Sequence, residues 1–151
     1  MELDLFKNNQ ITNKMEELTY DAKISVIKIL SEIMNADSIV RDSEIKYIND
    51  VIKSFGLNEN YKSDIDNMMM LQALSIIRNL SSEQKTKIAQ MMGNMIIVDK
   101  DINYNEVKMY NIFCESCDIK DEFNPEEYPD CSFSGDFIFV ENDETTEETL
   151  I

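Results

Sequence analysis

The 151-residue sequence contains no histidine or tryptophan, and only three glycines and two prolines. Sandwiches and barrels need turn residues at regular spacing, so this scarcity favours long helices. The sequence also lacks a glycine-rich phosphate loop and a G-x-S-x-G motif. With no histidine, phosphate loop or nucleophile elbow, nothing marks a catalytic centre, and we expect a protein that is not an enzyme.

Long hydrophobic runs are missing as well. No apolar stretch approaches the roughly 18 residues of a membrane span, and the mixed, polar residues 1–17 do not resemble a signal peptide. We therefore expect a cytoplasmic protein without membrane insertion.

Basic side chains are scarce, with 14 against 30 acidic ones, which gives a formal net charge of −16. Residues 1–120 contribute 14 − 19 = −5, and residues 121–151 contribute eleven carboxylates and no basic group. Because phosphate backbones repel such an acidic tail, we expect no nucleic-acid binding. It fits either a solubilising tail or an acidic decoy for a basic partner.

Apolar residues recur at steps of three and four, the period of an amphipathic helix. This pattern predicts helices within five stretches, with Gly56 as the C-cap of the second: 14–36, 45–55, 58–80, 86–96 and 107–117. The ten methionines fit a helical core as flexible gap-fillers.

An internal repeat is the most informative feature. Shifted by 62 positions, residues 18–57 lie over 80–119 without a gap. Identical pairs include Asp37 with Asp99 and Glu44 with Glu106, and many core positions pair apolar with apolar, such as Leu30 with Met92. Each copy is predicted to form a capped long helix, a tight acidic turn and a second helix. Two such hairpins can pack face to face in a domain spanning 1–120.

The two turns resemble the signature of the tellurite-resistance TerB family, also found in a DnaJ-like co-chaperone. There a helix ends in Ala-Asp-Gly, and a Glu opens the next helix; the counterparts here are 36–44 and 98–106. The resemblance implies an all-α bundle of about seven helices with an acidic surface that could bind metal. One departure is clear: Ser38 and Lys100 replace the signature glycine, and neither suits a position with positive φ.

The second turn places oxygen side chains at alternate positions, as at the opening of an EF-hand loop. Tyr104 and Tyr110 replace the glycine and the bidentate glutamate of that motif, so any site is a shortened one closed by Glu106. The predicted ligands of a divalent cation, most simply Ca²⁺, are Asp99, Asp101, Asn103 and Glu106, with Asp37, Asp42 and Glu44 as a weaker sister loop.

Helix capping explains the same residues without a metal. Asn103 and Glu106 fit a capping box, in which Asn103 caps the helix and Glu106 accepts from its backbone amide. Asp37 and Asp99 could likewise accept hydrogen bonds from turn amides. Two functions follow: a cation-responsive binding module in a stress-response or envelope-associated complex, or a metal-independent protein-interaction module that uses its helical surface and acidic tail. Both involve a protein partner that the sequence does not identify.

Two smaller features complete the prediction. Cys114 and Cys117 form a C-x-x-C, but the repeat places them over the core positions Ile52 and Phe55, so we expect buried, inert thiols. Within the acidic extension 121–151, the strand-like segment 133–140 contains four consecutive apolar residues. We expect it to dock on its own domain or on a partner.

Overall fold

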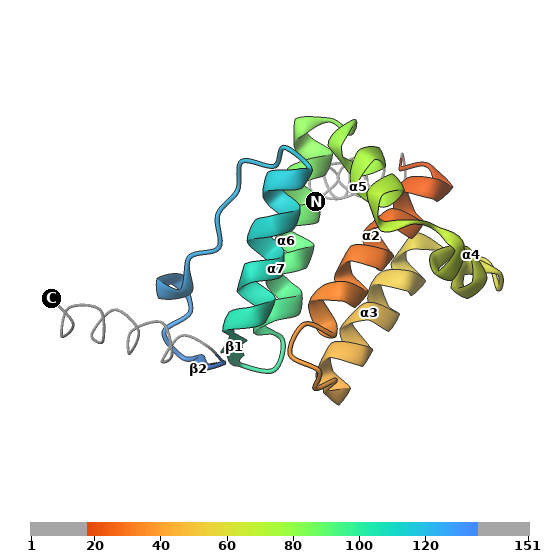
Figure 1. Cartoon of the computed structure of the whole chain (residues 1–151). Helices are drawn as coiled ribbons and strands as arrows, with labels where there is room; N and C mark the ends of the chain where they lie inside the picture. The colour runs from red at the N-terminus through yellow and green to blue at the C-terminus, as the bar shows by residue number, and fades with distance from the viewer. Residues whose placement is uncertain (1–17, 136–151) are drawn as a thin grey trace, which may run out of the picture.

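The computed structural model describes residues 18–135, which form the all-α fold that the sequence predicts (Figure 1). Six α-helices lie in this range, slightly fewer than the roughly seven expected. They are α2 (Tyr20–Met34), α3 (Asp42–Phe55), α4 (Tyr61–Asn67), α5 (Met70–Arg78), α6 (Ser82–Ile97) and α7 (Tyr104–Ser116).

The long helices α2 and α6 start in the same way. The Thr19 hydroxyl accepts a hydrogen bond from the Ala22 amide at 3.1 Å, and the Ser81 hydroxyl accepts one from Gln84 at 3.1 Å. The Gln84 side chain accepts in turn from the Ser81 amide at 3.0 Å, completing a capping box. The two N-caps are one repeat length apart.

The backbone repeats the same pattern at both ends of α3 and α7. Ser38 and Lys100 have φ values of 64° and 62°, and Gly56 and Asp118 have φ values of 63° and 55°. Each pair is 62 residues apart, so the second half of the chain repeats the first in backbone conformation. Ser38 and Lys100 adopt the left-handed conformation that glycine would adopt at lower cost.

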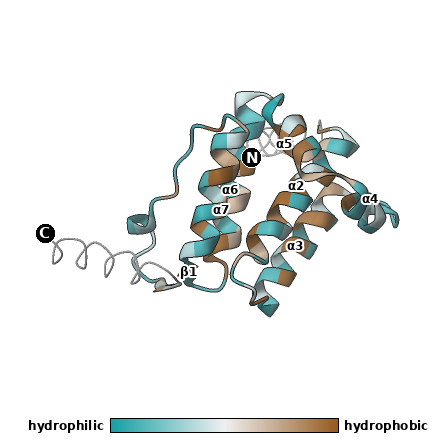
Figure 2. Cartoon of the chain, viewed as in Figure 1, coloured by the Kyte–Doolittle hydropathy of each residue, from teal (hydrophilic) through white to brown (hydrophobic). Residues whose placement is uncertain are grey.

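The core is centred on α2, which packs against α3, α5, α6 and α7. Figure 2 shows apolar residues on the sides of these helices that face one another. The largest fully buried apolar side chains are Ile24, Ile27, Ile29, Leu30, Ile33, Ile77, Ile88, Met92, Met95, Ile96 and Ile102. At about 1.5–3 kcal/mol for each buried side chain, this core holds the two hairpins together.

Cys114 and Cys117 are 4% and 0% exposed and belong to this core, as predicted, while Cys131 is half-buried against it. Burial raises the pKa of the Cys114 thiol to about 12 and that of the Cys117 thiol to about 11. Both therefore stay protonated at neutral pH, and protonated thiols are poor nucleophiles.

The segment after α7 runs back along the domain. The Phe123 ring packs edge-on against Tyr110 with centroids 5.7 Å apart and stacks on Tyr128 at 5.6 Å. A 3₁₀ turn (Pro125–Glu127) follows, and then the strand β2 (Ser132–Ser134). Phe123, Tyr128 and Cys131 of this segment therefore pack against the helical core.

β2 pairs in parallel with the short strand β1 (Asp101–Asn103), which lies between α6 and α7. Asp101 lies opposite Ser132, Ile102 opposite Phe133, and Asn103 opposite Ser134. The strand starts one residue before the predicted segment 133–140, of which residues 136–140 lie outside the described residues. No helix between residues 18 and 135 is long and apolar enough to cross a membrane.

Candidate functional site

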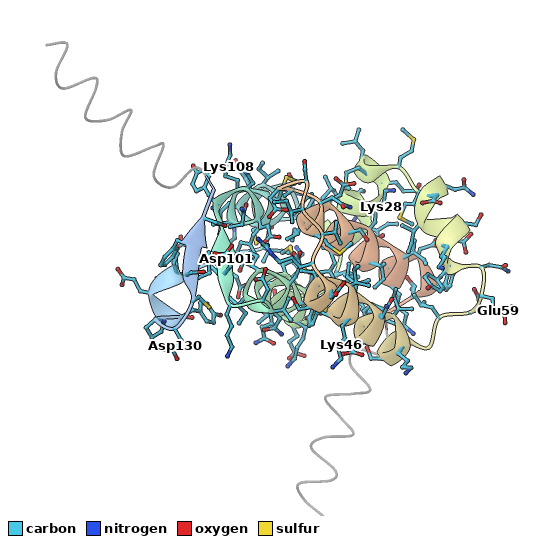
Figure 3. The ribbon with its side chains drawn as sticks, turned by 90° about the horizontal axis from the view of Figure 1, so that it is seen from below. Lys28, Lys46, Glu59, Asp101, Lys108 and Asp130 are labelled. Carbon is cyan, nitrogen blue, oxygen red and sulfur yellow. The ribbon has the colours of Figure 1, made fainter. Side chains whose placement is uncertain are left out.

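The two acidic turns of the repeat meet at one end of the molecule. The α2–α3 loop and the α6–β1 loop lie beside each other at the bottom of Figure 1. Figure 3, which views this end from below, labels Asp101 on β1 and Lys46 on α3. A direct contact joins the loops, because the Arg41 guanidinium lies 2.8 Å from the Asp99 carboxylate.

In the first loop, two carboxylates bond the backbone. Asp37 Oδ1 accepts a hydrogen bond from the Ile39 amide at 3.0 Å, which closes an Asx turn around Ser38. Glu44 Oε1 accepts one from the Arg41 amide at 3.0 Å, which satisfies a free amide at the start of α3. The second oxygen of each carboxylate is left for other contacts.

The second loop matches the first only in part. Asp99 Oδ1 accepts from the Asp101 amide at 3.1 Å, as Asp37 does from Ile39. The Asn103 side chain caps α7, accepting from Asn105 and Glu106 at 2.8 and 3.4 Å. The predicted capping box is thus half correct. Asn103 caps the helix, but Glu106 accepts no hydrogen bond from a donor in the described chain.

Arg41 is the one cation in contact with these carboxylates among the described residues. Its guanidinium lies 2.8 Å from Asp99, 3.6 Å from Asp37 and 3.8 Å from Asp101. The Asp37 and Asp99 side chains are 5% and 9% exposed, so these ion pairs are largely shielded from water. A shielded pair interacts more strongly than an exposed one, and Arg41 holds the two loops together.

Glu44 and Glu106 are the most deeply buried charged residues described, each 1% exposed. Three of their carboxyl oxygens accept no hydrogen bond from an N–H or hydroxyl group in this part of the chain, so their one hydrogen-bonding partner there is the facing carboxyl: Glu44 Oε2, Glu106 Oε1 and Glu106 Oε2. Burial raises the pKa of both groups, and the neighbouring Glu44 raises the pKa of Glu106 further. The two facing carboxyls therefore share at least one proton at neutral pH.

The remaining predicted ligands have other partners. The Asp101 carboxylate accepts hydrogen bonds from the Ser132 and Ser134 hydroxyls at 2.7 and 2.5 Å, and so holds β2 in place. The Asn103 amide nitrogen donates to Ser134 at 3.1 Å. Asp42 is exposed in the first turn of α3 and makes none of these contacts within the described residues. The structure therefore joins Asp37, Glu44, Asp99, Asp101 and Glu106, and leaves Asp42 outside the group.

We call these five carboxyl groups and Arg41 the acid cluster. Carboxylate oxygens are the ligands that hard cations such as Ca²⁺ prefer. Among residues 18–135, no group of three or more aspartate, glutamate or cysteine side chains is arranged so that it could hold a metal ion without rearrangement. Arg41 occupies the position of a cation among the carboxylates, so an incoming ion would have to replace it.

Sequence reasoning missed Arg41, which is part of the acid cluster, and the two serines that hold Asp101. Arg41 pairs with Asp37 within its own loop but reaches Asp99 only because the two loops pack together, and its own sequence neighbourhood does not show this. Ser132 and Ser134 gave no signal, because they lie about 30 residues from Asp101 and reach it only through strand pairing.

The comparisons with known proteins address the fold. The chain resembles the crystal structure of a protein of unknown function from Porphyromonas gingivalis W83, with a TM-score of 0.59 and 20% sequence identity. The match covers 69% of this chain and 87% of that one. No family model matches, and no curated protein does. At this identity, the likeness shows a shared helical fold and nothing about function.

Proposed function

We propose that the protein is a non-catalytic, divalent-cation-responsive binding module whose sensing element is the acid cluster. The observation that carries the proposal is the buried pair of facing carboxyls on Glu44 and Glu106, whose three inward oxygens have no N–H or hydroxyl donor within residues 18–135 and only a shared proton between them. One shared proton cannot satisfy all three oxygens, a buried oxygen left without a partner costs about 1–3 kcal/mol, and a bound cation would remove that cost.

Charge balance supports the same proposal. Five carboxyl groups surround one guanidinium, so the acid cluster keeps a net negative charge even when Glu44 and Glu106 share a proton. A divalent cation would displace that proton and compensate the remaining charge. The ligands would come from both copies of the repeat, chiefly Asp37 and Glu44 from the first and Asp99 and Glu106 from the second.

Arg41 provides the response. Without an ion, its guanidinium neutralises Asp37 and Asp99 and bridges the loops. An ion bound to the same carboxylates would release Arg41 toward solvent, where its side chain is already 33% exposed. Cation binding would thus change the surface of the α2–α3 loop, and a protein partner could detect that change.

The resemblance to the TerB family gives this module its proposed setting, a stress-response or envelope-associated complex in the cytoplasm. The alternative is an interaction module that works without metal. Its supporting observation is the exposed apolar pair Met69 and Leu71, 69% and 76% exposed at the start of α5. In that case the acid cluster only stabilises the fold, and removing its charges changes stability without any dependence on cations.

Calorimetric Ca²⁺ titration of matched variants separates the two functions. Asp99→Asn should abolish cation binding, whereas Asp42→Asn, also a sister-loop candidate but exposed, should leave it unchanged. Arg41→Gln should bind Ca²⁺ more tightly than the wild type, because the competing cation is gone. Absence of binding in both the wild type and Arg41→Gln would leave the metal-independent module as the explanation.

A further inference from the structure

The two copies of the repeat differ in what covers the residues that follow the positive-φ position. In the second copy these residues are β1, which β2 covers by parallel pairing. Their counterparts in the first copy are residues 39–41, and no strand pairs with them among the residues described. Burial differs accordingly: Ile102 is 0% exposed, whereas its counterpart Val40 is 43% exposed and the neighbouring Ile39 is 56% exposed.

The residue that ends this stretch already has the backbone conformation of a strand. Arg41 is extended, with φ −102° and ψ 153°, as is its counterpart Asn103, with φ −89° and ψ 131°. The Ile39 amide is bonded to Asp37 and the Arg41 amide to Glu44. No hydrogen bond to the Val40 amide is found within residues 18–135. This amide lies at the centre of an open strand edge.

We propose that residues 39–41 form a strand-docking edge, and that its occupant is Phe139-Val140-Glu141 of the chain's own C-terminal segment, which lies outside the described residues. The pairing would be parallel, as between β1 and β2, with Phe139 opposite Ile39, Val140 opposite Val40, and Glu141 opposite Arg41. In the second copy, the Ser132 amide donates to the Lys100 carbonyl at 2.9 Å. By the same pattern, the Phe139 amide would donate to the Ser38 carbonyl.

The side chains on the two edges explain why the occupants differ. β1 presents Asp101, Ile102 and Asn103, and its partner β2 supplies Ser132, Phe133 and Ser134. The Ser132 hydroxyl donates to Asp101, and the Ser134 hydroxyl accepts from Asn103. The edge in the first copy presents two apolar residues, Ile39 and Val40, and then the basic Arg41. Phe139-Val140-Glu141 supplies an apolar, an apolar and an acidic one. The two opposed apolar pairs are of a kind that stabilises neighbouring strands, whereas Arg41 is already held by Asp37 and Asp99.

Chain length and charge also favour this segment. The described chain ends at Gly135, where an added Cβ would lie 3.2 Å from Asn103 and Tyr104, so the segment starts beside β1. The five residues from Ser134 to Phe139 span up to about 17 Å. The segment starts at the end of the molecule where the two loops lie beside each other, so this length is available for the crossing from β1 to the α2–α3 loop (Figure 1). Lys46, near the start of α3 directly after this edge, is exposed and would attract the carboxylates that follow (Figure 3).

Amide hydrogen exchange by NMR on the full chain tests the docking, in chelator so that cations play no part. The Val40 amide should exchange at least about tenfold more slowly in the wild type than in Phe139→Ser/Val140→Ser, because that variant loses the strand. Leu150→Ser, a matched change further along the same segment, should leave the rate at its wild-type value. The Ile102 amide on β1 serves as an internal reference that no variant should affect.

Three results would overturn the proposal. Equal Val40 exchange in the wild type and the double variant would show that the edge is open. Equal loss of protection in Leu150→Ser would show that the effect is not specific to residues 139–141. Protection that increases over a tenfold rise in protein concentration would assign the edge to a second copy of the chain.

Discussion

Glu106→Gln should make the protein more stable at neutral pH and remove much of its pH dependence. Glu106 is 1% exposed, and neither of its carboxyl oxygens accepts from an N–H or hydroxyl group in the described chain. Burial, followed by the proximity of Glu44, raises its pKa above the ordinary value of 4.5. Glutamine keeps the shape, carries no charge and can donate to the free oxygen of Glu44.

The magnitude follows from proton linkage. Because the pKa is raised in the folded state, the folded chain keeps a proton between pH 5.5 and 7.5 that the unfolded chain has already released at pH 5.5. The free energy of unfolding then falls by about 1.4 kcal/mol per pH unit, or about 3 kcal/mol over this window. The stabilisation that this proton provides is fully present below the pKa of Glu106 in the unfolded chain, and it is lost as pH rises toward the pKa in the folded chain. Glu106→Gln has no such proton. Its free energy of unfolding, relative to that of the wild type, should therefore rise by up to about 3 kcal/mol between pH 5.5 and 7.5.

Urea unfolding at pH 5.5, 6.5 and 7.5, at fixed ionic strength and with chelator, measures this difference. Asp42→Asn is the matched control, since an exposed carboxylate should alter stability by a similar small amount at each pH. The reasoning is refuted if Glu106→Gln destabilises the protein at pH 7.5 while the pH slope stays that of the wild type. Such a result would mean that the Glu106 carboxylate is ionised and has a partner.

Three further predictions concern the loops around the acid cluster. Ser134→Ala should lower the free energy of unfolding by about 1.5–3 kcal/mol, because it removes hydrogen bonds to the charged Asp101 and to Asn103; thermal unfolding measures this, and no change would mean that β2 is not held there. Asn103→Ala should cost about 1 kcal/mol in urea unfolding, the usual value of an N-cap, and a cost near zero would contradict the capping role. Lys100→Gly should raise stability by up to about 1 kcal/mol, since glycine adopts the φ of 62° without strain, and a loss of stability would contradict that assignment.

Much of the fold could be predicted because its signals are local or periodic. The helical period, the Thr19 and Ser81 caps and the shift of 62 residues predicted two matching hairpins, and the structure has them. The positive φ at Ser38 and Lys100 was harder to predict, because neither residue favours that conformation alone. The repeat offered the clue, since both turns must make the same bend.

The acid cluster could be predicted only by residue type. Alternating oxygens in 99–105 suggested one loop wrapped around an ion, but local bonds hold Asn103, and strand pairing from β2 holds Asp101. The structure instead joins equivalent residues of both copies across Arg41. Which acidic side chains meet depends on how the hairpins pack, and no spacing within one turn contains that information.

An NMR titration of the isotope-labelled wild type with Ca²⁺ tests most directly whether the two loops form one cation-responsive site. If they do, amides in 37–44 and 99–106 shift together with a single dissociation constant, and the Arg41 side-chain resonance moves in the same titration. A single shared site is contradicted if millimolar Ca²⁺ shifts neither loop, or if only one loop responds while Arg41 does not change.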